Sequence, residues 1–230
     1  MSNTALEQTH ELLRRRYMAG QQILIQGGVR SPEDKGDLPG EHFTFARFLD
    51  HVEGRAKYGV HVVDQNDTVC FAIFDVDVVP RNLPDAELVP ALRRLLPTAI
   101  AIRRALLDMG LGEDQILSEF SGVGIHLWLF FEPAVPAARA HALLRRAMTL
   151  AGDPDVPFRP TLTEDGRGDT RGTVNLPLRM NRGFRSAFVP DLSTFDPTSY
   201  SQELDASLLV RVRPLDTQAL SQIEEAMQHR

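Results

Sequence analysis

The stretch FAIFDVDVV, residues 71–79, carries the clearest structural signal of the chain. Apart from two aspartates it is apolar, β-branched and aromatic, which is typical of a buried strand. Because side chains alternate along a strand, Asp75 and Asp77 share one face, with carboxylates about 5–7 Å apart. Two carboxylates at that separation repel, and apolar surroundings oppose their ionisation. A divalent cation removes this penalty, so the pair predicts a Mg²⁺ or Mn²⁺ site. The alternative is a strand end whose aspartates face water.

A second informative stretch is SGVGIHLWLF, residues 121–130. Its glycines allow the backbone to turn tightly and to approach a ligand closely. In the strand that follows, His126, Trp128 and Phe130 share one face. Two interpretations follow. The histidine is either a hydrogen-bonded core residue of a tight hairpin, or it lies on the same sheet face as the aspartates and donates a hydrogen bond to a phosphate.

The third stretch is TVNLPLRMNRG, residues 173–183, followed by AFVPD at 187–191. It reads as a strand that ends in closely spaced arginines. Arg179 and Arg182 offer planar guanidinium groups to phosphate oxygens. Asp191 ends a second apolar strand, where it is either a third carboxylate of the site or a residue that initiates a turn or caps a helix before Ser193.

Hydrophobic periodicity between residues 69 and 150 predicts the element order β-α-β-β-α. The elements expected there are a strand at 69–79, a helix from about 82 to 111, strands at 115–120 and 125–131, and a helix at 136–150. This order predicts an α+β fold whose core is an RRM-like sheet flanked by helices.

Outside that core the pattern is less regular. The expected elements are a helix at 4–19, a short strand at 23–25, a loop at 27–40, a helix at 43–52, a strand at 58–63, short strands near 174–178 and 186–189, and a helix at 217–229. No linker divides the chain, so we expect one domain over residues 1–230. It comprises an N-terminal helix and loop (1–42), a core (43–191) and a helical extension (192–230).

The composition is that of an ordinary globular protein, with 43% hydrophobic and 24% charged residues among 230. No apolar run approaches the roughly 20 residues of a membrane span, and the N-terminus lacks the apolar stretch of a signal peptide. Cys70 is the single cysteine, which excludes an internal disulfide and a cysteine-based zinc site. We therefore expect a cytoplasmic protein without a membrane partner.

The cations are almost all arginines and are unevenly distributed. The net charge of −6 argues against a generic nucleic-acid coat. Six arginines nevertheless lie between residues 159 and 185, against three acidic residues. A small basic surface on an acidic body favours a localised phosphate contact over the wrapping of a long duplex.

Together these three stretches resemble the archaeo-eukaryotic primase superfamily, which is known by a strand-borne D-x-D, a later s-x-H and a third acid after an apolar strand. Asp75 and Asp77, the Gly124–His126 step and Asp191 match these motifs in order. The resemblance is closest to the primase-polymerase branch of mobile elements, phages, and CRISPR or TOTE conflict systems, with its SGxGxHxWxFF-like signature. It covers about residues 43–191.

The third acid departs from the family pattern, because Pro190 stands where the usual motif has the acid. Glu164 and Asp165 are the alternatives to Asp191 for that role. No cysteine and histidine cluster is present, so the zinc motif of some relatives is absent from this sequence.

The resemblance implies template-directed nucleotidyl transfer by a primase-polymerase that synthesises or extends primers. Two Mg²⁺ or Mn²⁺ ions would be held by Asp75, Asp77 and Asp191. The residues implied in binding the incoming nucleotide are Ser121, Gly122, Gly124, His126, Arg179, Asn181 and Arg182. Contacts to nucleic acid would come from Arg159, Arg167, Arg171 and Arg185.

The implied partners are a single-stranded DNA template with its primer, and nucleoside triphosphates. Both de novo priming and primer extension fit these residues, and so do both dNTPs and NTPs. Relatives often work with a helicase. Because this sequence has no GxxxxGK[ST] loop, an unwinding motor would be a separate module, fused or in trans.

Three other functions account for some of these residues. A glycosyltransferase that binds a nucleotide-sugar through D-x-D leaves SGVGIH and the arginines without a role. A nuclease of the histidine–hydrophobic–histidine type needs two histidines, and GIHLW has one. A catalytically inactive primase fold that serves as a replication initiator or nucleic-acid-binding module is the main alternative, and the intact aspartate pair argues against it.

Overall fold

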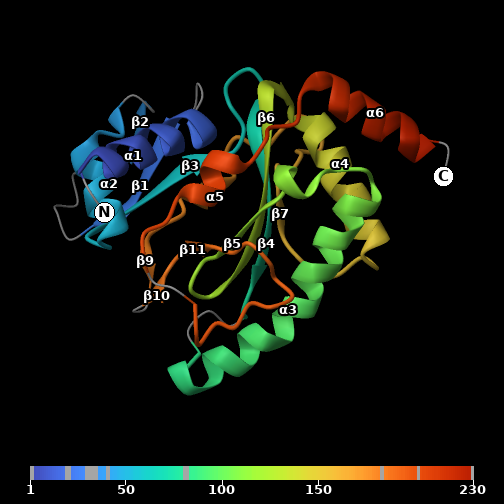
Figure 1. Cartoon of the computed structure of the whole chain (residues 1–230). Coiled ribbons are helices and arrows are strands. Elements are labelled where there is room, and N and C mark those ends of the chain that lie inside the picture. The colour runs from blue at the N-terminus through green and yellow to red at the C-terminus, as the bar shows by residue number, and fades with distance from the viewer. Residues whose placement is uncertain are drawn as a thin grey trace.

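The computed structural model describes residues 3–18, 22–28, 36–39, 42–79, 83–181, 184–200 and 203–228. Its centre is a five-stranded antiparallel sheet of order β11-β5-β6-β4-β7 (Figure 1). The bounds of these strands are β4 Thr68–Asp77, β5 Leu117–Phe120, β6 Gly124–Pro136, β7 Phe158–Arg159 and β11 Ala187–Phe188. With helices α3 (Asp85–Asp108) and α4 (Ala137–Leu150), the chain order is β4-α3-β5-β6-α4-β7. This confirms the predicted α+β fold with an RRM-like core.

The register between β4 and β6 decides which side chains share a face. Phe71 pairs with Phe130, Ile73 with Trp128, and Asp75 with His126. Because the side chains of paired residues lie on the same side of an antiparallel sheet, one face changes from apolar to polar along the two strands. The opposite face packs against α3 and α4, which lie together on one side of the sheet in Figure 1.

Helix α1 (Asn3–Tyr17) covers the apolar end of the first face. The buried Tyr17 ring contacts Phe71, Trp128 and Phe130, with ring centroids 5.6, 4.9 and 5.2 Å apart. Aromatic contacts at these separations add to the hydrophobic stabilisation of the pair. The polar end of the same face is left to line a cleft.

A second antiparallel sheet, of order β2-β1-β3-β8, lies beside the first (Figure 1). Its strands are β1 Gln22–Gly28, β2 Gly36–Pro39, β3 Ala56–His61 and β8 Thr173–Asn175, and helix α2 (Phe45–Val52) contacts β3. Strand β3 contains Gly59, where an added Cβ would lie 2.6 Å from the Val174 carbonyl oxygen. Glycine therefore allows the close approach of β3 and β8 that forms one wall of the cleft.

The remaining elements are short or peripheral: η3 Glu113–Gln115, β9 Met180–Asn181, β10 Phe184–Arg185, α5 Ser207–Arg211 and α6 Thr217–Gln228. Most predicted elements are present with small shifts at their ends. The predicted loop at 27–40 was wrong in part, because β2 forms there by pairing with β1. The strand predicted near 174–178 ends at Asn175, since Pro177 lacks an N–H and Leu178 has φ +69°. None of the described helices has the length and apolarity needed to cross a membrane.

His51, on α2, links three segments behind the second sheet. It is fully buried, its Nε2 lies 3.1 and 3.0 Å from the carbonyl oxygens of Leu176 and Pro177, and its Nδ1 accepts from the Tyr58 N–H. Burial lowers the pKa of His51 to about 4. A neutral imidazole, with one donor and one acceptor nitrogen, satisfies all of these groups.

The neutral state of His51 predicts a pH dependence of stability. Its folded pKa of about 4 is below its ordinary value of 6.5, so the unfolded chain binds the proton more readily. His51 thus stabilises the fold above pH 6.5, and this contribution, on the order of 3 kcal/mol, is lost as the pH falls to 4. Urea unfolding at several pH values should show that His51→Gln is less stable at pH 7 and less sensitive to acid. The exposed His42→Gln is the control, and equal acid sensitivity of the wild type and His51→Gln would contradict the assignment.

Candidate active site

A cleft of about 430 Å³ separates the two sheets. The side chains that line it from the central sheet and its turns are Ile73, Asp75, Asp77, Glu119, Ser121, Val123, His126 and Arg159. Those on the opposite wall and at its edge are Lys57, Thr173, Val174, Asn175, Leu176, Arg179 and Ser186. Acidic groups therefore face basic ones across a space large enough for a small molecule.

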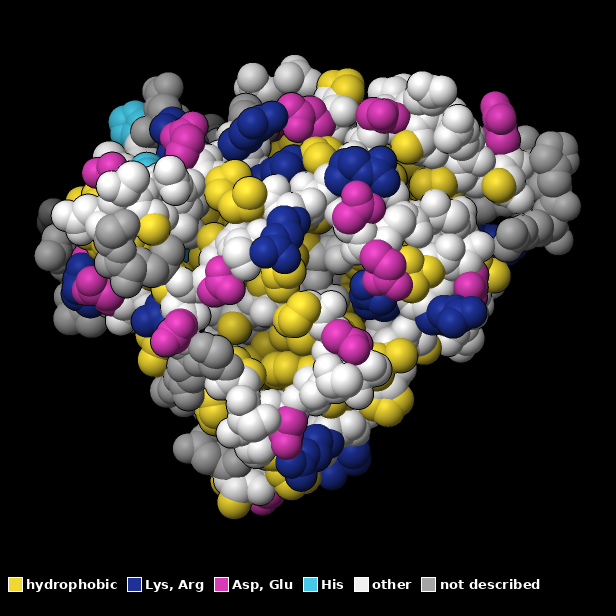
Figure 2. All heavy atoms as spheres, viewed as in Figure 1, with side chains coloured by type: hydrophobic (Ala, Val, Ile, Leu, Met, Phe, Trp, Pro, Cys, Tyr) yellow, Lys and Arg dark blue, Asp and Glu magenta, His cyan; other side chains and the backbone are white. Residues whose placement is uncertain are grey.

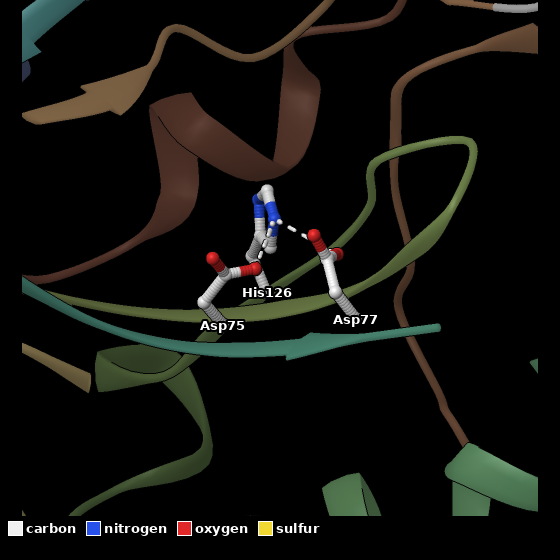
Figure 3. Close-up of side chains that lie close together, drawn as sticks. All are labelled: Asp75, Asp77 and His126. Carbon is white, nitrogen blue, oxygen red and sulfur yellow. Dashed lines mark ion pairs between the residues drawn. The ribbon is translucent and has the colours of Figure 1, made fainter. Parts of the chain in front are cut away.

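Asp75, Asp77 and His126 form the centre of the acidic wall (Figure 3). One ligand atom of each lies within 4.8 Å of those of the other two. The Nε2 atom of His126 is 3.2 Å from Asp75 Oδ1 and 3.8 Å from Asp77 Oδ1. Figure 3 shows all three side chains on the same side of neighbouring strands β4 and β6. The prediction that the aspartates and the histidine share a sheet face is confirmed.

Gly124 provides the room that Asp77 occupies. The two residues are paired in the β4–β6 register. A Cβ at position 124 would collide with Asp77 Oδ1 and would lie 2.6 Å from the Val76 carbonyl oxygen. Any larger residue must therefore displace the Asp77 carboxylate. Gly124 is predicted from the sequence to bind the incoming nucleotide, and the structure adds a steric role beside the acidic pair.

A buried carboxylate lies behind His126. Glu119 is 2% exposed, and its Oε2 accepts hydrogen bonds from His126 Nδ1 at 3.0 Å and from Trp128 Nε1 at 2.7 Å. Its Oε1 accepts from the Ser186 hydroxyl. Burial alone lowers the pKa of His126, but the charges of Glu119 and Asp75 and the hydrogen bonds to them outweigh it and raise this pKa well above 6.5. The imidazole thus lies between acids on both of its nitrogens.

The basic wall is centred on Arg179. This side chain is half-buried, and burial lowers the pKa of its guanidinium. Its Nε is shielded from solvent and has no hydrogen-bond partner among the described residues. Partial desolvation of a cation is costly unless an anion pairs with it, and the described residues contain no ion pair of Arg179. Together with Lys57 and Arg159, Arg179 offers an anionic ligand a strong interaction in the cleft.

The turn between β5 and β6 contains two further predicted residues, Ser121 and Gly122, and Gly122 is not among the residues that line the cleft. Ser121 lines the cleft, and its backbone N–H donates to the Gly124 carbonyl oxygen at 2.9 Å. Gly122 has φ +90°, which favours glycine. The side chain of Asn181 and all of Arg182 lie outside the described part of the chain, so their predicted roles toward the nucleotide stay predictions.

The structure does not bring Asp191 to the acidic pair. Its carboxylate is exposed and accepts hydrogen bonds from the Ser193 N–H and hydroxyl, both at 2.8 Å. The Ser193 hydroxyl lowers the pKa of Asp191. This is the turn-initiating role that the sequence left open. Glu164 and Asp165, the alternatives, are exposed and do not line the cleft. The candidate metal site therefore includes neither of them, nor Asp191.

The four arginines expected to contact nucleic acid differ in their surroundings. Arg159 lines the cleft. Arg167 and Arg171 are exposed, and Arg171 pairs with Asp169 at 3.2 Å. Arg185 is half-buried and donates to the carbonyl oxygens of Val52 and Leu178, which is a structural role. Figure 2 shows basic and acidic side chains interspersed over the viewed face.

The sequence did not predict several polar residues of the cleft, among them Lys57, Glu119 and Asn175. Glu119 had a detectable signal, because a charged residue interrupts the buried strand LSEF just before the glycine turn. Lys57 and Asn175 depend on the pairing of β3 with β8. These strands are more than a hundred residues apart in sequence, and no local sequence pattern predicts that they pair.

Comparison with known proteins shows the family of this chain. The family model of the archaeo-eukaryotic primase domain of TOTE conflict systems matches residues 37–218. The match spans most of the chain, and the chain belongs to this family. Among solved structures, the AEP domain of the primase-polymerase (PrimPol) of cyanophage S-2L is similar, with 17% sequence identity and a TM-score of 0.43 over 92% of this chain and 98% of that chain. No curated protein matches.

The donor set suits a hard divalent cation. Two carboxylates and an imidazole offer oxygen and nitrogen atoms within 4.8 Å of one another, and Mg²⁺ and Mn²⁺ prefer carboxylate oxygens together with those of a phosphate ligand. Burial of Asp77, whose side chain is 9% exposed, adds a desolvation cost to the repulsion between the carboxylates, and a cation would offset both. Asp75 and Asp77 are therefore the side chains that would hold the metal.

The steric role of Gly124 is testable without any enzymatic assay. In Gly124→Ala the new methyl group displaces the Asp77 carboxylate, and we expect Mn²⁺ affinity to fall at least about tenfold, by analogy with changes in groups that orient metal ligands. Val210→Ala is the control, since Val210 is exposed and does not line the cleft. Isothermal titration calorimetry gives both affinities. Equal Mn²⁺ affinity in Gly124→Ala and the wild type would remove Gly124 from the site.

Proposed function

We propose that this protein is a primase-polymerase that transfers nucleotides to the 3′ end of a growing chain on a single-stranded DNA template. The observation that carries the proposal is the approach of Asp75, Asp77 and His126 to within 4.8 Å of one another in a cleft whose other wall is basic. Membership in the archaeo-eukaryotic primase family supports it. The reaction breaks the bond between the α- and β-phosphates and releases pyrophosphate as the primer oxygen bonds to the α-phosphate.

In this proposal, Asp75 and Asp77 bind the metal ions and hold them on the wall of the cleft. Bound Mg²⁺ or Mn²⁺ would lower the pKa of the primer hydroxyl and neutralise charge on the phosphates, as in other two-metal sites. Asp75 and Asp77 supply the negative charge that holds such ions, and β4 keeps both side chains on the wall of the cleft. Gly124, on the neighbouring strand, leaves the space that the Asp77 carboxylate occupies.

The imidazole and the basic wall stabilise the triphosphate. His126 Nε2 points toward the acidic pair, so in the proposed complex it donates to phosphate oxygens held there. Arg179 and Lys57 line the cleft, and in the proposed complex they contact the β- and γ-phosphates. Fixed cations in a partly desolvated cleft stabilise charge that develops on the leaving pyrophosphate.

Template and primer would reach the cleft along its rim, where contacts to the sugar-phosphate backbone need no base recognition. Arg159 within the cleft and the exposed Arg167 and Arg171 are the proposed cations. Arg185 is not included, because backbone carbonyls already use its guanidinium. A helicase, as a separate module, would expose the single strand.

Loss of the acidic pair should abolish the activity. In Asp75→Asn/Asp77→Asn the cleft keeps its shape but loses the charges that bind metal, so incorporation of labelled dNTPs or NTPs on primed and unprimed templates should fall at least about a thousandfold with Mg²⁺ or Mn²⁺. The exposed Asp155→Asn is the matched control, and circular dichroism reports folding. Asp191→Asn, assayed beside them, should stay active. Normal incorporation by the folded double variant would refute the proposed site.

Replacement of Arg179 tests the basic wall. Arg179→Met retains much of the side-chain volume and removes the cation, so the KM for the nucleotide should rise about 10–100-fold, as expected for a lost hydrogen bond to a charged group. The exposed Arg145→Met, outside the cleft and without a proposed role, is the comparison. Steady-state kinetics over a range of nucleotide concentrations measures the change. Equal KM values for the two variants would place the triphosphate elsewhere.

A further inference from the structure

Glu119 is a buried charge that the proposed reaction does not use directly. It belongs to β5, and the β5–β6 register pairs it with His126. Its side chain is 2% exposed. A carboxylate is rarely retained at such a position unless hydrogen bonds compensate for its desolvation. Here three side-chain donors, from His126, Trp128 and Ser186, converge on its two oxygens.

The first of these bonds fixes the orientation of the His126 ring. Nδ1 lies 3.0 Å from Glu119 Oε2, while Nε2 lies 3.2 Å from Asp75 Oδ1. A ring flipped about its Cβ–Cγ bond would place carbon atoms at both of these positions. Because Glu119 accepts at Nδ1, Nε2 is the nitrogen that faces the cleft. This is the logic by which outer carboxylates orient the histidines of many metal and catalytic sites.

A second branch of hydrogen bonds runs from Glu119 through Ser186 to the basic wall. Glu119 Oε1 accepts from the Ser186 hydroxyl, and the Ser186 oxygen in turn accepts from the Leu178 N–H at 3.0 Å. Leu178 has φ +69°, a conformation that is unfavourable for a residue with a side chain. The Ser186 N–H also donates to the Arg179 carbonyl oxygen at 2.8 Å. The chain is thus held in a strained turn just before Arg179.

We propose that Glu119 is the positioning residue of this active site, which orients His126 on the acidic wall and, through Ser186, the Arg179 segment on the basic wall. One buried side chain then sets the distance between the groups that meet the two ends of the triphosphate. The proposal rests on the proposed function for its catalytic consequence. The hydrogen bond between Glu119 and His126 can be tested independently of the proposed function.

The test of the bond uses protein labelled with ¹⁵N-histidine, without added metal. The proton on Nδ1 of His126, assigned by its loss in His126→Gln, should be visible by NMR in the wild type. Glu119→Leu removes the acceptor and should abolish this signal. Trp128→Phe is the matched control, because it changes the same buried cluster and leaves the Glu119–His126 bond intact. Persistence of the signal in Glu119→Leu, or its absence from the wild type, would overturn the proposal.

Glu119→Gln is the second variant, for the case in which Glu119→Leu does not fold. It is nearly isosteric and replaces a charged acceptor by a neutral one, which accepts a weaker hydrogen bond. The Nδ1 proton should remain and its resonance should move upfield. An unchanged resonance would show that Glu119 does not accept this proton and would overturn the proposal.

Kinetics separates positioning from general damage to the core. Glu119→Leu should lower kcat for nucleotide incorporation at least about tenfold below that of Trp128→Phe, as for loss of an oriented acid–base group. Ser186→Ala, which breaks only the second branch, should raise the KM for the nucleotide several-fold and leave the His126 signal unchanged. Equal kcat values for Glu119→Leu and Trp128→Phe would contradict the orientation of His126 by Glu119. An unchanged KM in Ser186→Ala would contradict the positioning of the Arg179 segment through Ser186. An inactive wild type would refute the proposed function, and NMR would still decide the bond.

Discussion

The antiparallel register of β4 and β6 is the constraint on which the site depends. It places Asp75 opposite His126 and Asp77 opposite Gly124. A shift by one residue would turn every side chain of β4 to the other face, carrying the acids to the side that α3 and α4 cover. Burial of Phe71, Ile73 and their partners prevents such a shift, because these side chains form the core. The hydrophobic core thus fixes the geometry of its charged end.

The central sheet and half of the site could be predicted from sequence, because their signals are local. Alternation along FAIFDVDVV placed both aspartates on one face, and the glycine turn before His126 indicated the hairpin that returns beside them. The apolar runs and helical periodicity between residues 69 and 150 were sufficient for the element order. Each of these inferences needs only neighbouring residues and the period of a regular element.

The opposite wall could not be predicted in this way, because it depends on contacts distant in sequence. Lys57 and Asn175 lie on one wall of the cleft because β3 pairs with β8. Asp191 resembled a third ligand by its position after an apolar strand, yet the Ser193 that follows it offers nearer donors and closes a turn. The partners of Glu119, namely His126, Trp128 and Ser186, come from separate segments. Its role became visible only when these were brought together.

The central claim is that the two sheets enclose one metal-bound triphosphate, with acids on one side and Arg179 on the other. A crystal structure of the wild-type protein with Mn²⁺ and a non-hydrolysable nucleotide triphosphate tests it directly, because anomalous scattering locates the metal. We expect a Mn²⁺ peak bounded by Asp75 and Asp77, with phosphate oxygens reaching His126 and Arg179. A nucleotide bound outside the cleft, or a metal held without either aspartate, would contradict it.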